Sequence, residues 1–264
     1  MDTALEEIEF LARSRNRIEV LAAVSQEPLT RGELATVTDA SQPTLSRILS
    51  DFEVRNWIEK TGSRYGATAT GRLVASGMTD LWETMETERT LRDIVAWLPT
   101  EAITFDLRRL HDAEITVPTR TRPSAPAQRS TALLGGGEQV RIVSHTFNEQ
   151  GLAAIHDATV DGTQTFEAVL DQDAVAAIVA DHDLRRQLRD LVVTERAEVR
   201  VADDSVPVSV SITDGTVHLL LRNDDNVLQA IVVSDDPTVR EWATDVFETY
   251  WDDADSLSVA DLSE

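Results

Sequence analysis

Apolar positions near the start of the chain recur at helical spacing and predict three helices. The first helix covers residues 3–25. Thr30 followed three residues later by Glu33 is the signature of a capping box, which predicts that a short helix begins there. Ser41 is the expected cap of the third helix, and Pro43 is tolerated because it falls in the first turn of that helix.

Two short strands follow the third helix. Residues 57–60 and 65–68 are rich in strand-forming side chains, and the turn between them contains a glycine, a pattern typical of a β-hairpin. A further helix, capped by Thr70, is expected at residues 70–98, with a break near Gly77. Helices followed directly by a hairpin form the layout of a winged helix-turn-helix, so we expect residues 1–75 to be such a domain.

From residue 132 onward, expected strands alternate with expected helices. The strands lie at residues 140–143, 166–170, 199–201, 208–212, 217–221 and 228–233, and the helices at residues 149–160, 173–193 and 237–251. We expect residues 132–251 to form an α/β domain with a mainly parallel sheet and an antiparallel edge. Residues 76–131 are expected to be a connecting helix and a Pro-rich linker, residues 135–137 a glycine turn, and residues 252–264 a frayed acidic tail.

Charge is unevenly distributed along the sequence. The chain has 264 residues and a formal net charge of −23, and all but one of its 24 basic side chains are arginine. Residues 1–75 carry nine basic and eleven acidic side chains, and residues 29–75 alone carry six basic and five acidic ones. Because the remaining chain would repel a polyanion, any nucleic-acid interface is expected in this first part.

The acidic, nearly lysine-free composition is typical of cytoplasmic proteins of salt-in halophilic archaea. Molar salt shortens the Debye length to about 3 Å and so screens the repulsion between carboxylates. An ordinary acidic protein from a GC-rich organism is the alternative. No apolar run reaches the ~18 residues that a membrane span needs, and the acidic start differs from a signal peptide, so a cytoplasmic protein is expected. The absence of cysteine excludes disulfides and thiolate sites.

The helix that begins at Ser41 has an apolar face and a polar face, as a DNA-recognition helix requires. Its polar face centres on Arg47, which can pair bidentately with guanine, while Gln42 can pair with adenine. Thr30 and Arg31 suit phosphate contacts, although Thr30 and Ser41 would cap their helices with or without DNA. The candidate DNA-binding residues are Thr30, Arg31, Ser41, Gln42, Pro43, Thr44, Ser46, Arg47, Ser50, Ser63 and Arg64.

Two groups of segments resemble known families. One group resembles segments of the archaeal winged-helix regulators related to the MarR, ArsR and TrmB groups. It consists of Leu29–Leu34, Ser41–Arg47, Trp57–Glu59, Tyr65 and Thr68–Arg72. The second group resembles segments of the haloarchaeal regulators that have a methanogenesis-regulator-type middle domain. It consists of Asp106-Leu107, Leu110–Ala113 and Trp242-Ala243. The resemblance implies a homodimeric transcription factor whose C-terminal domain has phospholipase-D-like topology and senses a ligand.

No set of catalytic residues is recognisable in the sequence. Phospholipase D chemistry needs a histidine followed two residues later by a lysine, but the one lysine, Lys60, lies in the expected hairpin. The five histidines are scattered without the spacing of zinc ligands, and no nucleophile elbow occurs. We therefore expect no catalytic site, no metal site and no cofactor.

A small anionic effector, such as a phosphorylated metabolite, is the expected ligand of the α/β domain. Ligands of open α/β sheets bind beyond the carboxyl ends of the strands, and arginines in an acidic domain offer them positive charge. An internal carboxylate is the commoner partner of an arginine inside a strand, and a plain dimerisation domain is the alternative to a sensor. The candidate effector-binding residues are Arg120, Arg122, Arg141, Ser144, His145 and Arg200.

We therefore expect a dimeric regulator that binds specific sequences of double-stranded DNA. The candidate dimer surfaces are the first helix and the helix that carries Leu81, Trp82, Met85, Leu91, Ile94, Val95 and Leu98. Two alternatives remain open. One is a winged helix that serves protein contacts only, and the other is a small-molecule enzyme with an accessory winged helix.

Overall fold

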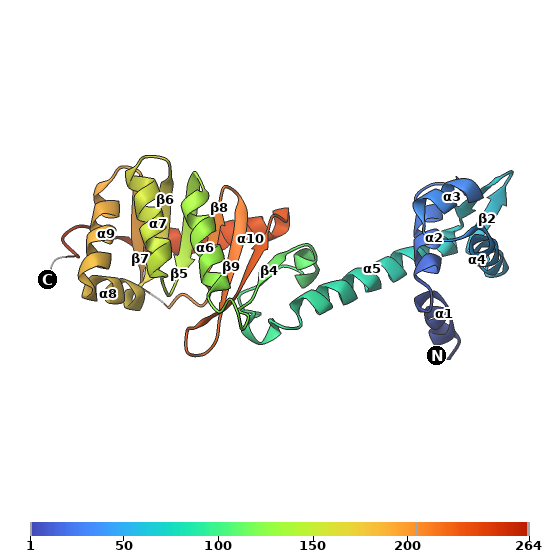
Figure 1. Ribbon diagram of the computed structural model, residues 1–264, viewed down its shortest axis with the longest axis horizontal. Helices are drawn as coiled ribbons and strands as arrows, with labels where there is room; N and C mark the ends of the chain where they lie inside the picture. Colours follow the sequence, from blue (N-terminus) through green and yellow to red (C-terminus); the bar gives the residue numbers. More distant parts are fainter. Residues whose placement is uncertain (1, 204, 263–264) are drawn as a thin grey trace. The chain divides into compact units, whose positions relative to one another are not determined.

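The computed structural model describes residues 2–203 and 205–262, which divide into two compact units, Met1–Glu86 and Thr87–Glu264 (Figure 1). The N-terminal unit contains the helices α1 (Asp2–Ala12), α2 (Arg15–Gln26), α3 (Arg31–Val37) and α4 (Gln42–Val54), the strands β1 (Leu29–Thr30), β2 (Ile58–Thr61) and β3 (Arg64–Ala67), and the start of α5 (Ala69–Leu91). The three strands form an antiparallel sheet in the order β1-β3-β2. This arrangement confirms the winged helix.

Apolar side chains from α2, α3, α4 and the wing share one core. Its fully buried members include Leu21, Leu34, Leu45 and Phe52, so the periodic residues of each helix point inward as their spacing predicts. Phe52 also packs against the ring of Trp57, with centroids 5.7 Å apart. The core thereby fixes α4 with its opposite face turned to solvent.

Three local expectations for this unit were wrong. Residues 3–25 form two helices rather than one, because Ser14 has an extended backbone and Arg17 binds the freed carbonyl of Phe10 at 2.6 Å. α5 continues without a break through Gly77, which is exposed and has open space around it. Its cap is Thr68 rather than Thr70: the Gly71 amide donates to Thr68 Oγ1 at 3.1 Å.

The C-terminal unit is built on an eight-stranded sheet in the order β11-β7-β6-β5-β8-β9-β10-β4. Its strands are β4 (Glu114–Thr116), β5 (Gln139–Ser144), β6 (Thr165–Asp171), β7 (Ala197–Ala202), β8 (Val210–Thr213), β9 (Thr216–Arg222), β10 (Leu228–Ser234) and β11 (Asp255–Ser256). β5, β6 and β7 are parallel, and every other pairing is antiparallel. The sheet is therefore mixed, and its antiparallel part extends over four strands beyond β5.

Helices cover both faces of this sheet (Figure 1). On one face lie α6 (Ala125–Gly136), α7 (Glu149–Val160), α8 (Gln172–Ala180) and α9 (His182–Val193), and on the other lies α10 (Pro237–Asp253). The short 3₁₀ helices Val95–Trp97 and Leu107–Leu110 belong to the α10 side, where Ile94 and Leu110 are fully buried with Trp242. The unit is thus a three-layer α/β/α structure.

The structure corrects three expectations for this unit. The Pro-rich segment ends in α6, so Gly135 and Gly136 form the last turn of that helix instead of a loop. The long helix expected at 173–193 is two helices, because Asp181 leaves helical geometry and caps α9. The tail is anchored: β11 pairs with β7, and Leu257 and Leu262 are buried in the core.

Candidate nucleic-acid interface

The capping residues of α3 and α4 form the contacts that the sequence predicts. Thr30 and Glu33 make a complete capping box, in which the Thr30 amide donates to Glu33 Oε2 at 2.7 Å and the Glu33 amide donates to Thr30 Oγ1 at 3.3 Å. Ser41 Oγ accepts from the Thr44 amide at 3.4 Å. Both helices therefore begin at positions fixed by local chemistry, which sets which side chains of α4 face outward.

The outward face of α4 consists of short polar side chains and one arginine. Gln42, Pro43, Arg47 and Ser50 are exposed, and Ser46 is half-buried with its hydroxyl bound to the Gln42 carbonyl at 3.0 Å. Within the described parts of the chain, Arg47 forms no hydrogen bond or ion pair. Short side chains around a free guanidinium let a helix approach the floor of a major groove.

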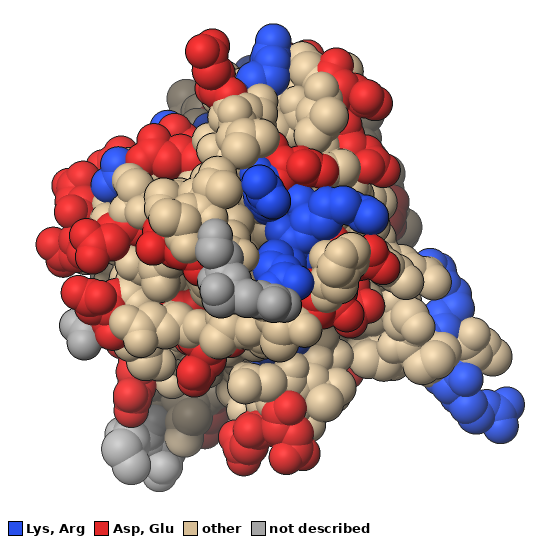
Figure 2. All heavy atoms as spheres, turned by 90° about the vertical axis from the view of Figure 1, so that its left-hand side faces the viewer, with Lys and Arg blue, Asp and Glu red and all other residues tan. Residues whose placement is uncertain are grey.

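Carboxylates are confined to the second half of α4. Asp51 lies 3.8 Å from the Arg17 guanidinium, and Glu53 is in the last turn. No acidic residue occurs in the first half of the helix. On the side of the molecule drawn in Figure 2, in contrast, many Asp and Glu side chains are spread around a central group of Lys and Arg. The first half of α4 is therefore free of the charge that repels phosphates.

A second basic group lies on the wing around Tyr65. Lys60 pairs with Tyr65 across β2 and β3, and its Nζ lies 5.3 Å from the centre of the tyrosine ring. Arg31 hydrogen bonds to the same tyrosine, and the two cations lower the Tyr65 pKa, Arg31 being the larger cause. Arg31 and Lys60 are both exposed. The sequence analysis did not single out Lys60, although its position opposite Tyr65 in a hairpin could have identified it.

Arg64 at the tip of the wing is occupied by internal contacts. Its Nη2 lies 3.1 Å from Glu33 Oε1, and its Nη1 donates to Glu33 Oε2 at 3.2 Å and to the Pro28 carbonyl at 2.7 Å. The neighbouring Ser63 is exposed in the turn, which depends on Gly62 with φ +64°. Arg31 at the start of α3 and Lys60 on the wing are thus available to phosphates, whereas Arg64 would first have to leave Glu33.

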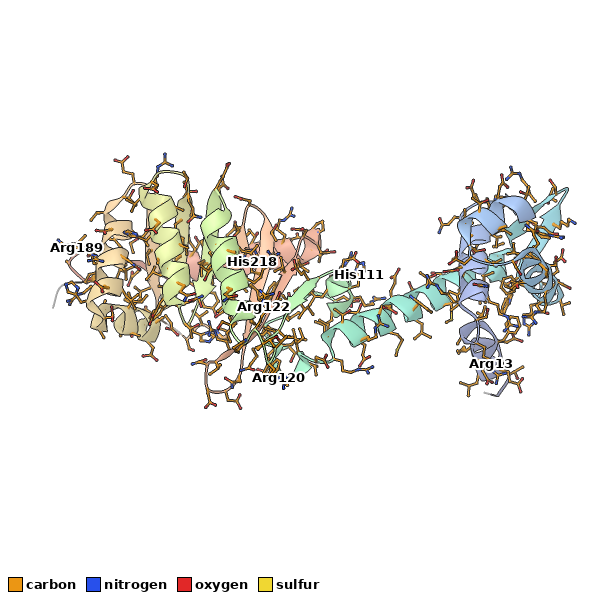
Figure 3. All side chains as sticks on the ribbon, viewed as in Figure 1. Arg13, His111, Arg120, Arg122, Arg189 and His218 are labelled. Atoms are coloured by element: carbon orange, nitrogen blue, oxygen red, sulfur yellow. The ribbon has the colours of Figure 1, made fainter. Side chains whose placement is uncertain are left out.

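The six candidate effector residues do not share one place in the structure. Arg120 and Arg122 are exposed in the turn before α6 (Figure 3). Arg141 pairs with Glu167 at 2.8 Å, and Arg200 pairs with Glu198 at 2.7 Å and lies over the ring of Trp251, on the α10 side of the sheet. Ser144 faces the α6 side, and His145 follows it with Nδ1 buried and unpaired. Both strand arginines therefore have internal carboxylate partners, which is the commoner arrangement.

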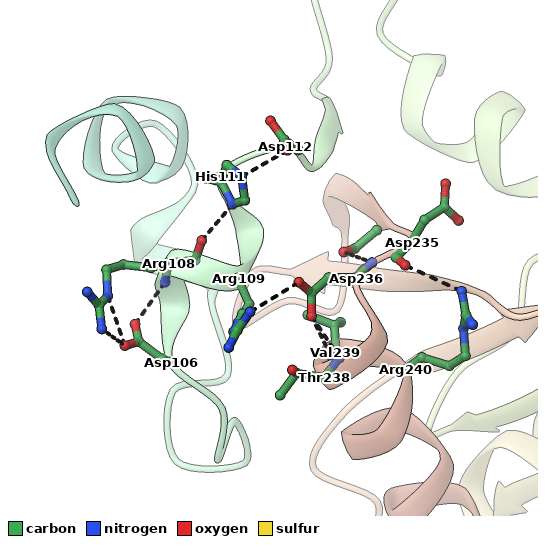
Figure 4. Close-up of polar contacts among 11 residues, drawn as sticks. Asp106, Arg108, Arg109, His111, Asp112, Asp235, Asp236, Thr238, Val239 and Arg240 are labelled. Carbon is green, nitrogen blue, oxygen red and sulfur yellow. Dashed lines mark hydrogen bonds and ion pairs between the residues drawn. The ribbon is translucent and has the colours of Figure 1, made fainter. Parts of the chain in front are cut away.

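A polar cluster near the start of α10 is structural (Figure 4). Asp106 binds the side chain and the amide of Arg108, contacts that lower its pKa to about 2. Asp236 caps α10 by accepting from the Thr238 amide at 2.8 Å, and Arg109 lies 3.9 Å from it. These contacts attach the 3₁₀ segment to α10, and they pair Asp106 with Arg108 and Asp236 with Arg109.

The described residues contain neither a metal-binding cluster nor a helix that could span a membrane. No group of three or more His, Asp or Glu side chains in residues 2–203 and 205–262 is arranged to hold a metal ion. No helix in the same residues is both long and apolar enough to cross a membrane.

Comparison with known proteins gives two family matches. The family described as HVO_A0261 N-terminal domain matches residues 5–90, and the family described as methanogenesis regulatory protein FilR1, middle domain, matches residues 123–253. Among proteins with curated descriptions, no sequence matches the chain.

Solved structures with a similar course of the chain were also found. The archaeal chromatin protein TrmBL2 is 16% identical, over 95% of this chain and 98% of its own, with a TM-score of 0.43. The phospholipase D family member Nuc from Salmonella typhimurium is 15% identical, over 55% of this chain and 99% of its own, with a TM-score of 0.44. NucT from Helicobacter pylori is 12% identical, over 55% and 98%, with a TM-score of 0.41. The two family matches together span most of the sequence, so an HVO_A0261-type N-terminal domain is followed in this chain by a FilR1-type middle domain.

Proposed function

We propose that the chain regulates transcription by binding specific sequences of double-stranded DNA through α4 and the wing. The observation that carries this proposal is the outward face of α4, on which Arg47 is exposed and forms no ion pair within the described residues, one turn before Asp51. A regulator-type domain follows the winged helix in the same chain. In this proposal Arg47 reads guanine, Gln42 reads adenine, and Arg31 and Lys60 hold phosphates.

The proposed division of labour predicts different effects of different substitutions. Arg47→Ala should cost about 1–3 kcal/mol of binding to a preferred duplex and relax the sequence preference, because a bidentate base contact is lost. Lys60→Ala should weaken binding to every duplex alike and make it less dependent on salt, because each phosphate contact contributes about 0.9 to the slope of log K against log salt.

The experiment is fluorescence anisotropy in concentrated potassium chloride, with a duplex selected from a random-sequence library and a scrambled duplex of equal length. Arg13→Ala is the matched control, since it removes one arginine charge from an exposed site directly after α1. The proposal requires that Arg47→Ala lose the preference for the selected duplex and that Arg13→Ala keep it. If the wild-type chain selects no duplex, the winged helix serves protein contacts instead.

We further propose that two copies associate through α1 and α5. Leu5, Ile8, Leu73 and Met85 are exposed on these helices, with Leu73 at 74% and Met85 at 55% of full exposure. Ala4, Ile8, Leu73, Gly77 and Leu81 also line a groove between the two helices that is almost entirely apolar. A continuous apolar surface of this kind is typical of a contact between chains.

Most of the dimer candidates that follow Met85 in the sequence are buried. Leu91, Ile94 and Leu98 are buried in the core of the C-terminal unit, so they are not available to a second copy, whereas Val95 is exposed. Sedimentation should show a dimer for the wild type and a monomer for the double variant Leu73→Glu, Met85→Glu. Val54→Glu, at an exposed apolar position on α4, is the control that should remain dimeric.

A further inference from the structure

A cavity of about 60 Å³ lies in the C-terminal unit between the sheet and the helices α6 and α7. Its lining changes in character across the sheet. On the β6 and β7 side it is apolar, with Phe166, Leu170 and Val199, whereas β8 and β9 contribute Ser211 and Arg222. The cavity therefore has an apolar end and a polar end.

Arg222 is an arginine without a carboxylate partner in a very acidic chain. Its Nε is buried and has no hydrogen-bond partner, and its Nη1 donates to the main-chain oxygen of Asn226 at 2.9 Å. Among the described residues no Asp or Glu forms an ion pair with it, although the sequence contains 47 acidic residues. Burial lowers the pKa of Arg222, which means that its charge is incompletely compensated. An anion in the cavity would supply the missing partner.

Two buried hydroxyl groups share the cavity wall with Arg222. Ser130 on α6 is 1% exposed and Ser211 on β8 is 2% exposed, and neither hydroxyl has a hydrogen-bond partner in the described residues. Ser144, in contrast, is satisfied by Ser209 at 2.8 Å and by the Thr146 carbonyl at 2.7 Å. Each of the two free hydroxyls can donate to a carboxylate oxygen.

Size and charge restrict the class of ligand. At about 10–15 Å³ for each water-sized group, the cavity accepts about four to six non-hydrogen atoms. One guanidinium and two hydroxyls can neutralise one negative charge, and the rest of the wall is apolar except for Ser144, Thr146 and Asn148. A phosphate group would bring more charge than the site can compensate, so these dimensions do not favour the phosphorylated metabolite expected from the sequence.

We propose that this cavity binds a small organic monocarboxylate, with the carboxylate on Arg222, Ser130 and Ser211 and a short hydrocarbon chain toward Phe166 and Leu170. A guanidinium holds a planar carboxylate with two parallel hydrogen bonds, and the aliphatic part fills space that water occupies poorly. The proposal rests on the proposed function, because it names the class of effector that the regulator binds. Binding of the carboxylate is measured without DNA, so its failure can be distinguished from a failure of the proposed DNA binding.

The test is isothermal titration of the full chain in concentrated potassium chloride with isobutyrate, isobutyramide and inorganic phosphate. Isobutyrate should bind, whereas the neutral amide and phosphate should bind at least about tenfold more weakly. Arg222→Gln should abolish isobutyrate binding, and Ser211→Ala should weaken it about tenfold. Arg189→Gln, at an exposed position on α9, is the matched control and should bind as the wild type does (Figure 3).

Circular dichroism of each variant separates lost binding from lost folding, and Ser211→Ala is the variant least able to disturb the fold. The proposal is overturned if isobutyrate and the closely related butyrate and propionate fail to bind the wild type. It is equally overturned if the folded Arg222→Gln variant binds as tightly as the wild type, or if the amide binds as well as the acid.

Discussion

Replacing Gly71 by alanine would place a methyl group where the wing leaves no room. A Cβ atom at this position lies 1.8 Å from the carbonyl oxygen of Trp57 and 2.7 Å from its carbonyl carbon. The obstacle is main chain, so no side-chain rotation can relieve it, and the first turn of α5 has to move away from the segment that leads into β2. Overpacking of this kind costs about 1–3 kcal/mol.

The matched control is Gly77→Ala in the same helix. Nothing lies within 4 Å of the Cβ position there, and the residue is exposed. Alanine is favoured over glycine inside a helix by about 0.5–1 kcal/mol, so this variant should be slightly more stable than the wild type. The same substitution, Gly to Ala, is thus expected to lower the free energy of unfolding at position 71 and to raise it at position 77.

Thermal unfolding followed by circular dichroism measures the difference. For a unit of this size, 1 kcal/mol corresponds to about 4–8 °C in Tm, so Gly71→Ala should lower the transition of the N-terminal unit by at least about 4 °C. The same variant should lose DNA affinity, because moving α5 displaces the wing. Equal melting temperatures for the two variants would refute the claim that the contact with Trp57 fixes α5 against the wing.

Three further outcomes are expected. Thr30→Ala should lower the stability of the N-terminal unit by about 1 kcal/mol in urea unfolding, because it removes the capping box, whereas Thr30→Ser should be nearly neutral. Asp181→Ala should destabilise the C-terminal unit by about 1 kcal/mol, because it frees the amides of Asp183 and Leu184 that now donate at 2.9 and 3.0 Å, and Asp181→Asn should restore most of this loss. Burial, helped by Arg129, lowers the pKa of His218 to about 4 from 6.5, while Asp235 opposes the shift. The unfolded chain therefore binds this proton first, and as the pH falls from about 6.5 to 4 up to about 3 kcal/mol of stability should be lost in the wild type but kept in His218→Leu.

Local chemistry made the winged helix predictable from sequence. The capping pairs at Thr30 and Ser41 act over three residues, and the periodic apolar residues of α4 specify its buried face without reference to the rest of the chain. Arg47 was placed correctly on the outward face for the same reason. Its role in DNA binding stays a prediction.

Non-local contacts set the features that the sequence did not reveal. The internal partner expected for Arg141 is Glu167, which becomes its neighbour only because β5 pairs with β6. The partner of Arg200 is Glu198, two residues earlier on the same strand. The sequence did not identify Arg222 as a candidate ligand-binding residue, because its isolation from carboxylates depends on where β8 and β9 lie in the sheet. A sequence shows which residues are charged, and the fold determines which of them are compensated.

β11 has a consequence for assembly. It pairs with β7 at one margin of the large sheet, where the main-chain groups of β7 would otherwise be open to another strand. The buried Leu257 and Leu262 hold this closure in place. A second polypeptide could add to the sheet at this margin only by displacing a segment that is itself part of the core. Addition of a strand from another chain to β7 is thereby blocked at this margin.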